Sequence, residues 1–304
     1  MRDMTSIVSP RRLRGRRAVG LFVAAVAALS TTTDPWSPVV YAQSPPTPRL
    51  SHIHGIAVDP ADPSALFLAT HYGLYRMSPD GTASLISNNQ NDYMGFTTHP
   101  NDASLLYASG HPAGGGNMGV IISRDGGRSW EQLSPGANGP VDFHAITISQ
   151  ADPQVMYGSY GRVQVSRDGG MSWDVMGSPP DDVFDLAASA VDPAMVYAAT
   201  RGGLFVSRDW GANWEPAGYP AQPAGLAHVG PDGGVYAFVL GTGLVRSSPY
   251  AFSWTLLSAD FEGLTVLHLA IDPTDTTRMY AVAQDSSIFA SSDGGQTWGP
   301  WPIS

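Results

Sequence analysis

The chain has 304 residues, no cysteine and a formal net charge of −10 at pH 7, and its 16 basic residues are all arginines. The lack of cysteine excludes disulfides and thiolate metal sites. From residue 43 onwards ten arginines stand against 24 acidic residues, an excess of negative charge that argues against nucleic acids and anionic membrane surfaces as partners.

The first 42 residues are predicted to be an export signal. Several arginines between Arg11 and Arg17 precede an apolar stretch from Ala18 to Leu29, and Val40-Tyr41-Ala42 is typical of a cleavage site. The apolar stretch is short for a membrane span, so we expect no span after cleavage. We therefore expect an exported protein, periplasmic or secreted, with the Sec and Tat routes both open. Residues 43–52 are predicted to form a Pro-rich linker.

A repeat with a period of about 40 residues runs through residues 53–304. The octamer pattern S-x-D-x-G-x-[S/T/N]-W occurs four times, and a fifth copy without the Asp ends at Trp254. Successive octamer tryptophans are 43, 41, 40 and 44 residues apart, a length that four strands and their turns would fill. The four complete octamers are SRDGGRSW (Ser123–Trp130), SRDGGMSW (Ser166–Trp173), SRDWGANW (Ser207–Trp214) and SSDGGQTW (Ser291–Trp298).

A second half-repeat, which reads as strand, Asp-Pro turn and strand, precedes each octamer. We therefore predict an all-β fold consisting of a single β-propeller of six four-stranded antiparallel blades, with each octamer at the turn between the third and fourth strands. Seven blades remain the alternative if the linker adds strands. The six units begin near Ile53, Met94, Ala145, Leu186, Leu226 and Leu267.

The octamer resembles the Asp box, or bacterial neuraminidase repeat, of sortilin-type propellers, xyloglucanases and Ycf48-type assembly factors. It also resembles exported bacterial propellers described as glycosylhydrolase-like, and the resemblance extends from His52 onwards. The motif has a local physical role, because its carboxylate accepts backbone N–H bonds across a tight turn and its Trp packs between blades. We therefore expect a structural and not a catalytic role for Asp125, Asp168, Asp209 and Asp293.

The two rims of the predicted disc carry different loops. Strands alternate in direction within an antiparallel blade, so the Asp-Pro turns and the octamers share one rim. The loops that enter the first strand and those that join the second to the third strand share the other. Because these loops are free of structural turns, we expect the ligand site at their mouth of the central channel.

Alignment of the six units brings histidines to this mouth. His54 at the start of the first strand aligns with Met94 and His144, and His71 in the loop after the second strand aligns with His111. Each histidine alone is better explained as a solvated or hydrogen-bonded loop residue, so the metal hypothesis depends on the set. His with Met favours copper, and three His with an open position suit zinc. The predicted ligand-binding residues are His54, His71, Asp92, Met94, His111, His144 and Arg201, and the predicted metal ligands among them are His54, His71, His111 and His144.

Three functions follow from these patterns. The first is a monomeric binding or assembly propeller for an envelope protein or a carbohydrate, and the second is a copper- or zinc-binding envelope protein. The third is a glycoside hydrolase with Asp92 and Glu262 as candidate carboxylates, which leaves enzyme activity undecided. Sialidase activity is not expected, because that family uses an Arg triad and a Tyr–Glu pair, and only three glutamates follow the leader.

Overall fold

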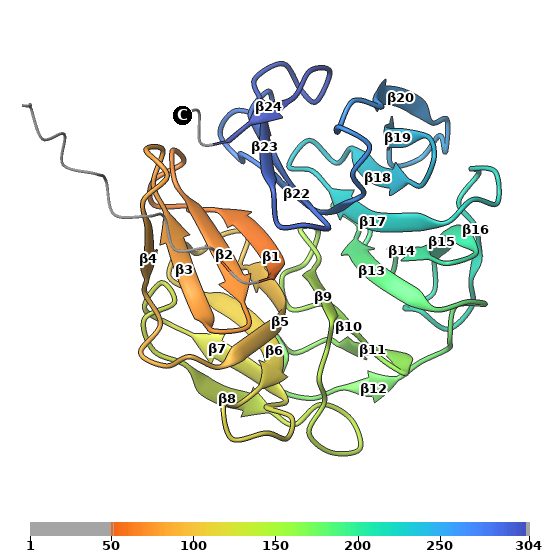
Figure 1. Cartoon of the computed structure of the whole chain (residues 1–304). Helices are drawn as coiled ribbons and strands as arrows, with labels where there is room; N and C mark the ends of the chain where they lie inside the picture. Colours follow the sequence, from red (N-terminus) through yellow and green to blue (C-terminus); the bar gives the residue numbers. More distant parts are fainter. Residues whose placement is uncertain (1–49, 51, 302–304) are drawn as a thin grey trace, which may run out of the picture. The chain divides into compact units, whose positions relative to one another are not determined.

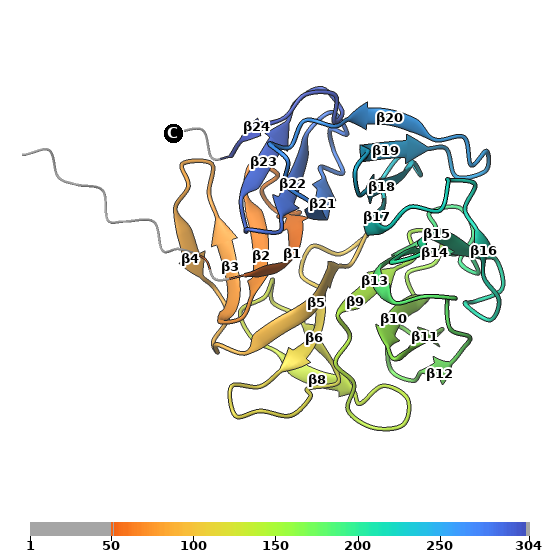
Figure 2. The same ribbon diagram turned by 45° about the vertical axis from the view of Figure 1, so that its right-hand side comes forward.

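Six four-stranded antiparallel sheets form the computed structural model, which describes Leu50 and residues 52–301. Figures 1 and 2 show the sheets arranged as blades around an axis. The chain is a six-bladed β-propeller, so the predicted fold class and blade number are confirmed. None of the described residues belongs to a helix that is able to span a bilayer.

Each blade is built from four consecutive strands. The first three blades contain β1 (Ile53–Val58), β2 (Leu66–Thr70), β3 (Gly73–Met77), β4 (Ala83–Leu85), β5 (Asp92–Thr98), β6 (Leu106–His111), β7 (Val120–Ser123), β8 (Glu131–Ser134), β9 (Ala145–Ile148), β10 (Met156–Tyr160), β11 (Arg162–Ser166) and β12 (Asp174–Val175). The last three contain β13 (Val183–Ala188), β14 (Val196–Thr200), β15 (Gly203–Ser207), β16 (Glu215–Pro216), β17 (Ala224–Val229), β18 (Val235–Val239), β19 (Gly243–Ser247), β20 (Thr255–Ser258), β21 (Val266–Ile271), β22 (Met279–Ala283), β23 (Ile288–Ser291) and β24 (Gly299–Pro300).

The second strand of most blades is buried along its whole length. Every residue of β2, β14, β18 and β22 is buried, because both faces of a blade pack against neighbouring blades. Their sequences are accordingly continuous runs of Val, Leu, Ala and aromatic residues instead of an alternation of apolar and polar residues. The first strands, β1, β5, β9, β13, β17 and β21, lie next to one another around the axis.

The ring closes by side-chain packing between the first and last blades. Because each blade contains only consecutive strands, no strand is exchanged between them. Ile56 and Leu68 of the first blade form one buried cluster with Tyr280 and Val282 of the last. Closure therefore depends on burial of apolar surface and not on backbone pairing.

The octamers form turns with one shared hydrogen-bond pattern. In the second of them, Asp168 accepts a bond from the backbone N–H of Ser172 at 2.9 Å, and it also contacts the hydroxyls of Ser172 and Ser166. In all four complete octamers a backbone N–H also donates to the turn between the first and second strands of the same blade, at 2.8–3.0 Å. The two kinds of turn thus lie on one rim, as the strand directions predicted.

Glycine is required inside the octamer turn. Gly127 has a φ of +90°, in the left-handed region, and a Cβ there would lie 2.5 Å from Leu74 of the preceding blade. The tryptophan that follows packs between blades, since Trp130 contacts a cluster that contains both Leu74 and Leu106. The predicted packing of the octamer Trp between blades is therefore observed.

Candidate binding site at the channel mouth

Strand pairing places His54 and His144 at equivalent positions in blades 1 and 3. Gly55, which follows His54, pairs with Ala69 near the end of β2. Ala145, which follows His144, pairs in the same way with Ser159 near the end of β10. In blade 2 Met94 holds this position, beside a bulge in β5. The predicted alignment of the six units is therefore the register of the folded chain.

A first group of polar side chains joins blade 1 to blade 2. Nε2 of His54, at the start of β1, lies 3.2–3.3 Å from both ring nitrogens of His71 in the loop after β2. Nδ1 of His71 lies 2.9 Å from Oδ2 of Asp92, the first residue of β5. The nitrogens of His52 also lie within 4.8 Å of those of His54 and His71. Oδ1 of Asp92 is buried without a hydrogen-bond partner among the described residues.

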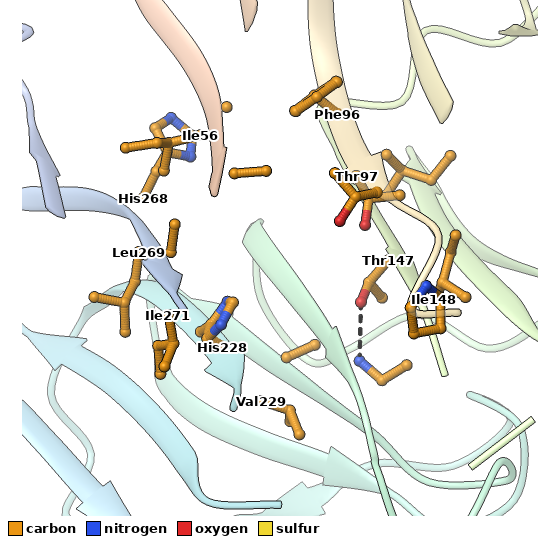
Figure 3. Close-up of a pocket in the computed structure, with 18 of the residues that line it drawn as sticks. Ile56, Phe96, Thr97, Thr147, Ile148, His228, Val229, His268, Leu269 and Ile271 are labelled. Carbon is orange, nitrogen blue, oxygen red and sulfur yellow. Dashed lines mark hydrogen bonds between the residues drawn. The ribbon is translucent and has the colours of Figure 1, made fainter. Parts of the chain in front are cut away.

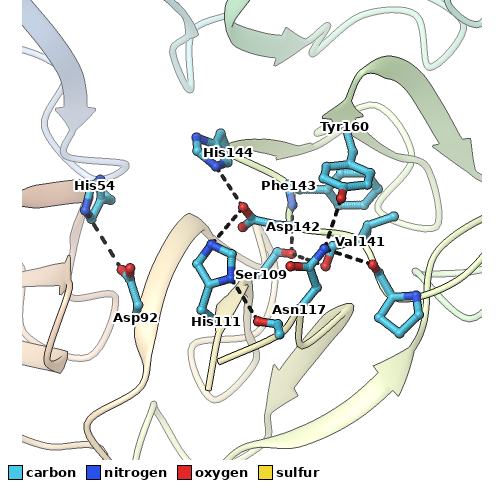
Figure 4. Close-up of polar contacts among 12 residues, drawn as sticks. His54, Asp92, Ser109, His111, Asn117, Val141, Asp142, Phe143, His144 and Tyr160 are labelled. Atoms are coloured by element: carbon cyan, nitrogen blue, oxygen red, sulfur yellow. Dashed lines mark hydrogen bonds and ion pairs between the residues drawn. The ribbon is translucent and has the colours of Figure 1, made fainter. Parts of the chain in front are cut away.

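A second group joins blade 2 to blade 3 (Figure 4). Oδ2 of Asp142 lies 3.0 Å from Nε2 of His111, at the end of β6, and 2.8 Å from Nε2 of His144. Asp142 is buried, and its Oδ1 has no hydrogen-bond partner within residues 52–301. The other ring nitrogen of His111 lies 2.9 Å from the carbonyl oxygen of Gly116. A carbonyl only accepts, so Nδ1 of His111 is the protonated nitrogen.

The pKa values of His54 and His144 are shifted in opposite directions. Burial, reinforced by the neighbouring His71, lowers the pKa of His54 to about 4, so this imidazole is neutral at pH 7. The hydrogen bond to Asp142 is the main cause that raises the pKa of His144, and the Asp92 carboxylate adds to it. The two groups are thus close enough for their charges to interact.

The second group is held by the protein core. Phe143, between Asp142 and His144, is fully buried and packs against Trp173 with ring centroids 5.0 Å apart. Its backbone N–H donates to Oγ of Ser109 at 2.9 Å. Both flanking side chains are therefore positioned by a rigid segment, although they lie in a loop.

Four large apolar side chains around the same mouth are exposed to solvent. Tyr72, Tyr160, Phe184 and Leu240 come from four different blades and are 59%, 49%, 48% and 38% exposed. The hydroxyl of Tyr160 accepts a hydrogen bond from Nδ2 of Asn117 at 3.1 Å, which fixes this ring beside the loop that follows His111 (Figure 4). Three of these four residues are aromatic, and exposed aromatic side chains are enriched at binding surfaces.

Other predicted site residues lie outside the two groups. Arg201 forms an ion pair with Asp182 at 2.6 Å on the surface of blade 4. Glu262 is exposed and has no hydrogen bond or ion pair to another described residue, and Met94 is half-buried at the start of β5. The structure thus brings together His54, His71 and Asp92, and separately His111 and His144. Asp142, which the alignment did not select as a ligand, is the centre of the second group.

Asp185, His228 and His268 line the central channel, and the sequence patterns did not select them as ligands. A cavity of about 560 Å³ runs between the first strands and is lined by Asp185, His228 and His268, with His54 and His144 at its mouth. Figure 3 shows His228 and His268 beside Leu269 and Ile271. Burial raises the pKa of Asp185 to about 7 and lowers that of each of the two histidines to about 4. Asp185 and His268 both occupy the position that Gly55 has in blade 1. The alignment of the six units therefore already placed these two residues at equivalent positions.

Comparison with known proteins shows the fold. No family model and no curated protein matches the chain. A xyloglucanase of family GH74 from Xanthomonas campestris is similar with a TM-score of 0.57 and 19% identity, over 83% of this chain and 45% of that one. A structure described as YCF48 bound to D1 peptide matches with a TM-score of 0.53 and 17% identity, over 83% and 82%. A chain of the nidogen/laminin complex matches with a TM-score of 0.60 and 11% identity, over 77% and 91%. At these identities the likeness is one of fold alone.

Proposed function

We propose that this chain is an exported binding propeller that takes a peptide segment of a protein partner at the mouth formed by the loops before the first strands and after the second strands. The observation that carries this proposal is the exposure of Tyr72, Tyr160, Phe184 and Leu240 around that mouth. Aromatic side chains supply large contact areas at low entropic cost, which is why they dominate binding hot spots.

The opposite rim supports the choice of face. There the carboxylates of the octamers bind their own turns, as Asp125 binds Ser129 and Asp293 binds Thr297. We assign these turns to the Asp-box class on this hydrogen-bond pattern. Groups that are engaged in holding turns offer few donors and acceptors to a partner. YCF48 with its D1 peptide and the nidogen/laminin complex are propellers of similar fold that bind a peptide or a protein, which fits this function.

Glycoside hydrolysis has less support. This chain spans 45% of the length of the xyloglucanase that it resembles in fold. The reaction needs two carboxylates that face the scissile bond, whereas Asp92 contacts His71 and Glu262 lies exposed in the loop before β21. Binding without hydrolysis therefore agrees better with the geometry.

Selection from a displayed peptide library tests the binding function. We expect the mature protein to enrich a peptide family, and Tyr160→Ala and Phe184→Ala each to weaken its binding by about tenfold or more. Tyr250→Ala is the matched control, because Tyr250 is 70% exposed on the octamer rim. The absence of any enriched family, or an equal loss in Tyr250→Ala, would contradict the proposal.

The export proposal has its own test, because the proposed signal, residues 1–42, lies outside the described residues. Expression of the full chain in a bacterium, followed by fractionation and N-terminal sequencing, should give a mature protein that begins at Gln43. Retention of the intact N-terminus in the cytoplasm would overturn this part of the proposal.

A further inference from the structure

We infer that the mouth binds two divalent transition-metal ions, one held by His54, His71 and Asp92 and the other by His111, Asp142 and His144. Each group has two imidazoles and one carboxylate, a donor set that suits Zn²⁺ and Cu²⁺ and does not suit Mg²⁺. The sequence pattern had suggested one set of four histidines. The folded chain instead divides them between two adjacent blade junctions and gives each pair an aspartate.

The spacing of the donor atoms fits a single ion in each group. Ligand atoms around a tetrahedral zinc ion with bonds of about 2.0 Å lie about 3.3 Å apart. Nδ1 of His71 lies 3.3 Å from Nε2 of His54 and 2.9 Å from Oδ2 of Asp92, and Oδ2 of Asp142 lies 3.0 and 2.8 Å from the nitrogens of its two histidines. Small rotations of the side chains are therefore enough to direct the donors at one point.

Unpaired carboxylate oxygens give a second, independent indication. Oδ1 of Asp92 and Oδ1 of Asp142 are buried and accept no hydrogen bond from the described part of the chain. A buried carboxylate oxygen without a donor loses its hydration without compensation and calls for a physical explanation. Two such oxygens in two histidine groups of one mouth are explained by a cation bound in each group.

The surroundings of His111 are those of a metal ligand. Metal-binding histidines usually donate the second ring N–H to a carbonyl or carboxylate, which fixes the tautomer and orients the ring. Nδ1 of His111 donates to the carbonyl of Gly116 at 2.9 Å, which leaves Nε2, 3.0 Å from Oδ2 of Asp142, as the nitrogen available to an ion. The buried Phe143 fixes the backbone that carries the other two ligands.

The two sites derive from the repeat. Asp92-Tyr93-Met94 and Asp142-Phe143-His144 hold the same positions at the entrances of blades 2 and 3. Met94 holds the position in blade 2 that His144 holds in blade 3. In the first site the second imidazole therefore comes from His54 of blade 1. The sites share no residue, so loss of one leaves the ligands of the other intact.

Metal stoichiometry of the mature protein without an affinity tag tests this inference. After treatment with a chelator and equilibrium dialysis against Zn²⁺ or Cu²⁺, we expect two ions per chain at micromolar free metal, and no retention of Mg²⁺. Asp92→Asn and Asp142→Asn should each retain one ion, and the double variant none. His99→Ala is the control, because His99 lies on the octamer rim and should leave two ions bound.

The remaining ion in each single variant also shows that the protein is still folded. Retention of fewer than one ion by the native protein, or two ions by the Asp92→Asn and Asp142→Asn variants, would overturn the inference. Metal binding is measured without any peptide, and the peptide selection is run in chelator. Failure of one proposal is therefore distinguishable from failure of the other.

Discussion

His71 and His111 occupy the same loop in successive blades, and each lies within hydrogen-bond distance of an aspartate at the entrance to the next blade, at 2.9 and 3.0 Å. The sequence repeat thus places a histidine next to an aspartate at two successive blade junctions. They also join neighbouring blades at the mouth, where no backbone pairing connects one sheet to the next.

Bound metal should stabilise the fold. An ion that binds only the folded state adds about 2.7 kcal/mol when its free concentration is a hundred times the dissociation constant. We expect added Zn²⁺ to raise the melting temperature of the native protein and to leave that of the Asp92→Asn, Asp142→Asn double variant unchanged. Differential scanning calorimetry measures both. An equal rise in the two proteins would place the ions elsewhere.

Asp185 should make the stability depend on pH. Burial raises the pKa of its carboxyl to about 7 in the folded chain, whereas the unfolded chain releases the proton near pH 4. The folded state therefore holds the proton more tightly, and the free energy of unfolding falls as the pH rises from about 4 to about 7.

Asp185→Asn removes this titration, so the variant should gain stability relative to the native protein between pH 5 and pH 8. Urea unfolding at the two pH values checks this difference, with the exposed Asp181→Asn as a control. A difference between variant and native protein that stays constant with pH would show that Asp185 is ionised in the folded channel.

Removal of an octamer carboxylate should destabilise the fold. Asp168→Ala loses three hydrogen bonds to Ser166 and Ser172, and we expect a loss of about 1–3 kcal/mol in the free energy of unfolding. Asp174→Ala is a matched control six residues away, because Asp174 is exposed and contacts only Arg167. Urea denaturation of both variants makes the comparison. Equal free energies of unfolding for the Asp168→Ala and Asp174→Ala variants would contradict the structural role of the turn.

Gly158→Ala should disturb the second metal site through the core. A Cβ at Gly158 would lie 2.5–2.7 Å from the ring of Phe143, which stands between Asp142 and His144. We expect a loss of about 1–3 kcal/mol from overpacking and weaker binding of one Zn²⁺ ion, with the ion at His54 retained. Gly299→Ala, where a Cβ meets open space, should have neither effect. Isothermal titration of both variants with Zn²⁺ gives the answer.

The repeat predicted the fold because its determinants are local. Octamers such as Ser166–Trp173 form their own hydrogen bonds, so their spacing and the count of the strand–turn–strand half-repeats gave the number of blades, and the alternation of strand direction gave the rim. The position of His54 relative to His144 followed from strand register, which the repeated apolar pattern fixes.

The division of the histidines into two groups did not follow from register. It depends on the lateral distance between blades and on bulges such as the one in β5, and neither has a sequence signal. The shared pattern of Asp92-Tyr93-Met94 and Asp142-Phe143-His144 was present and would have identified Asp142. The position of His268 could have been identified from the alignment, because it matches that of Gly55, whereas apolar periodicity alone does not show whether His228 faces the channel or a neighbouring blade.

The most direct test is an anomalous difference map from crystals of the mature protein grown with Zn²⁺ and collected at the zinc edge. The account predicts two peaks at the mouth, one among His54, His71 and Asp92 and one among His111, Asp142 and His144. A map with no peak in either group, or with zinc bound only on the octamer rim, would contradict it.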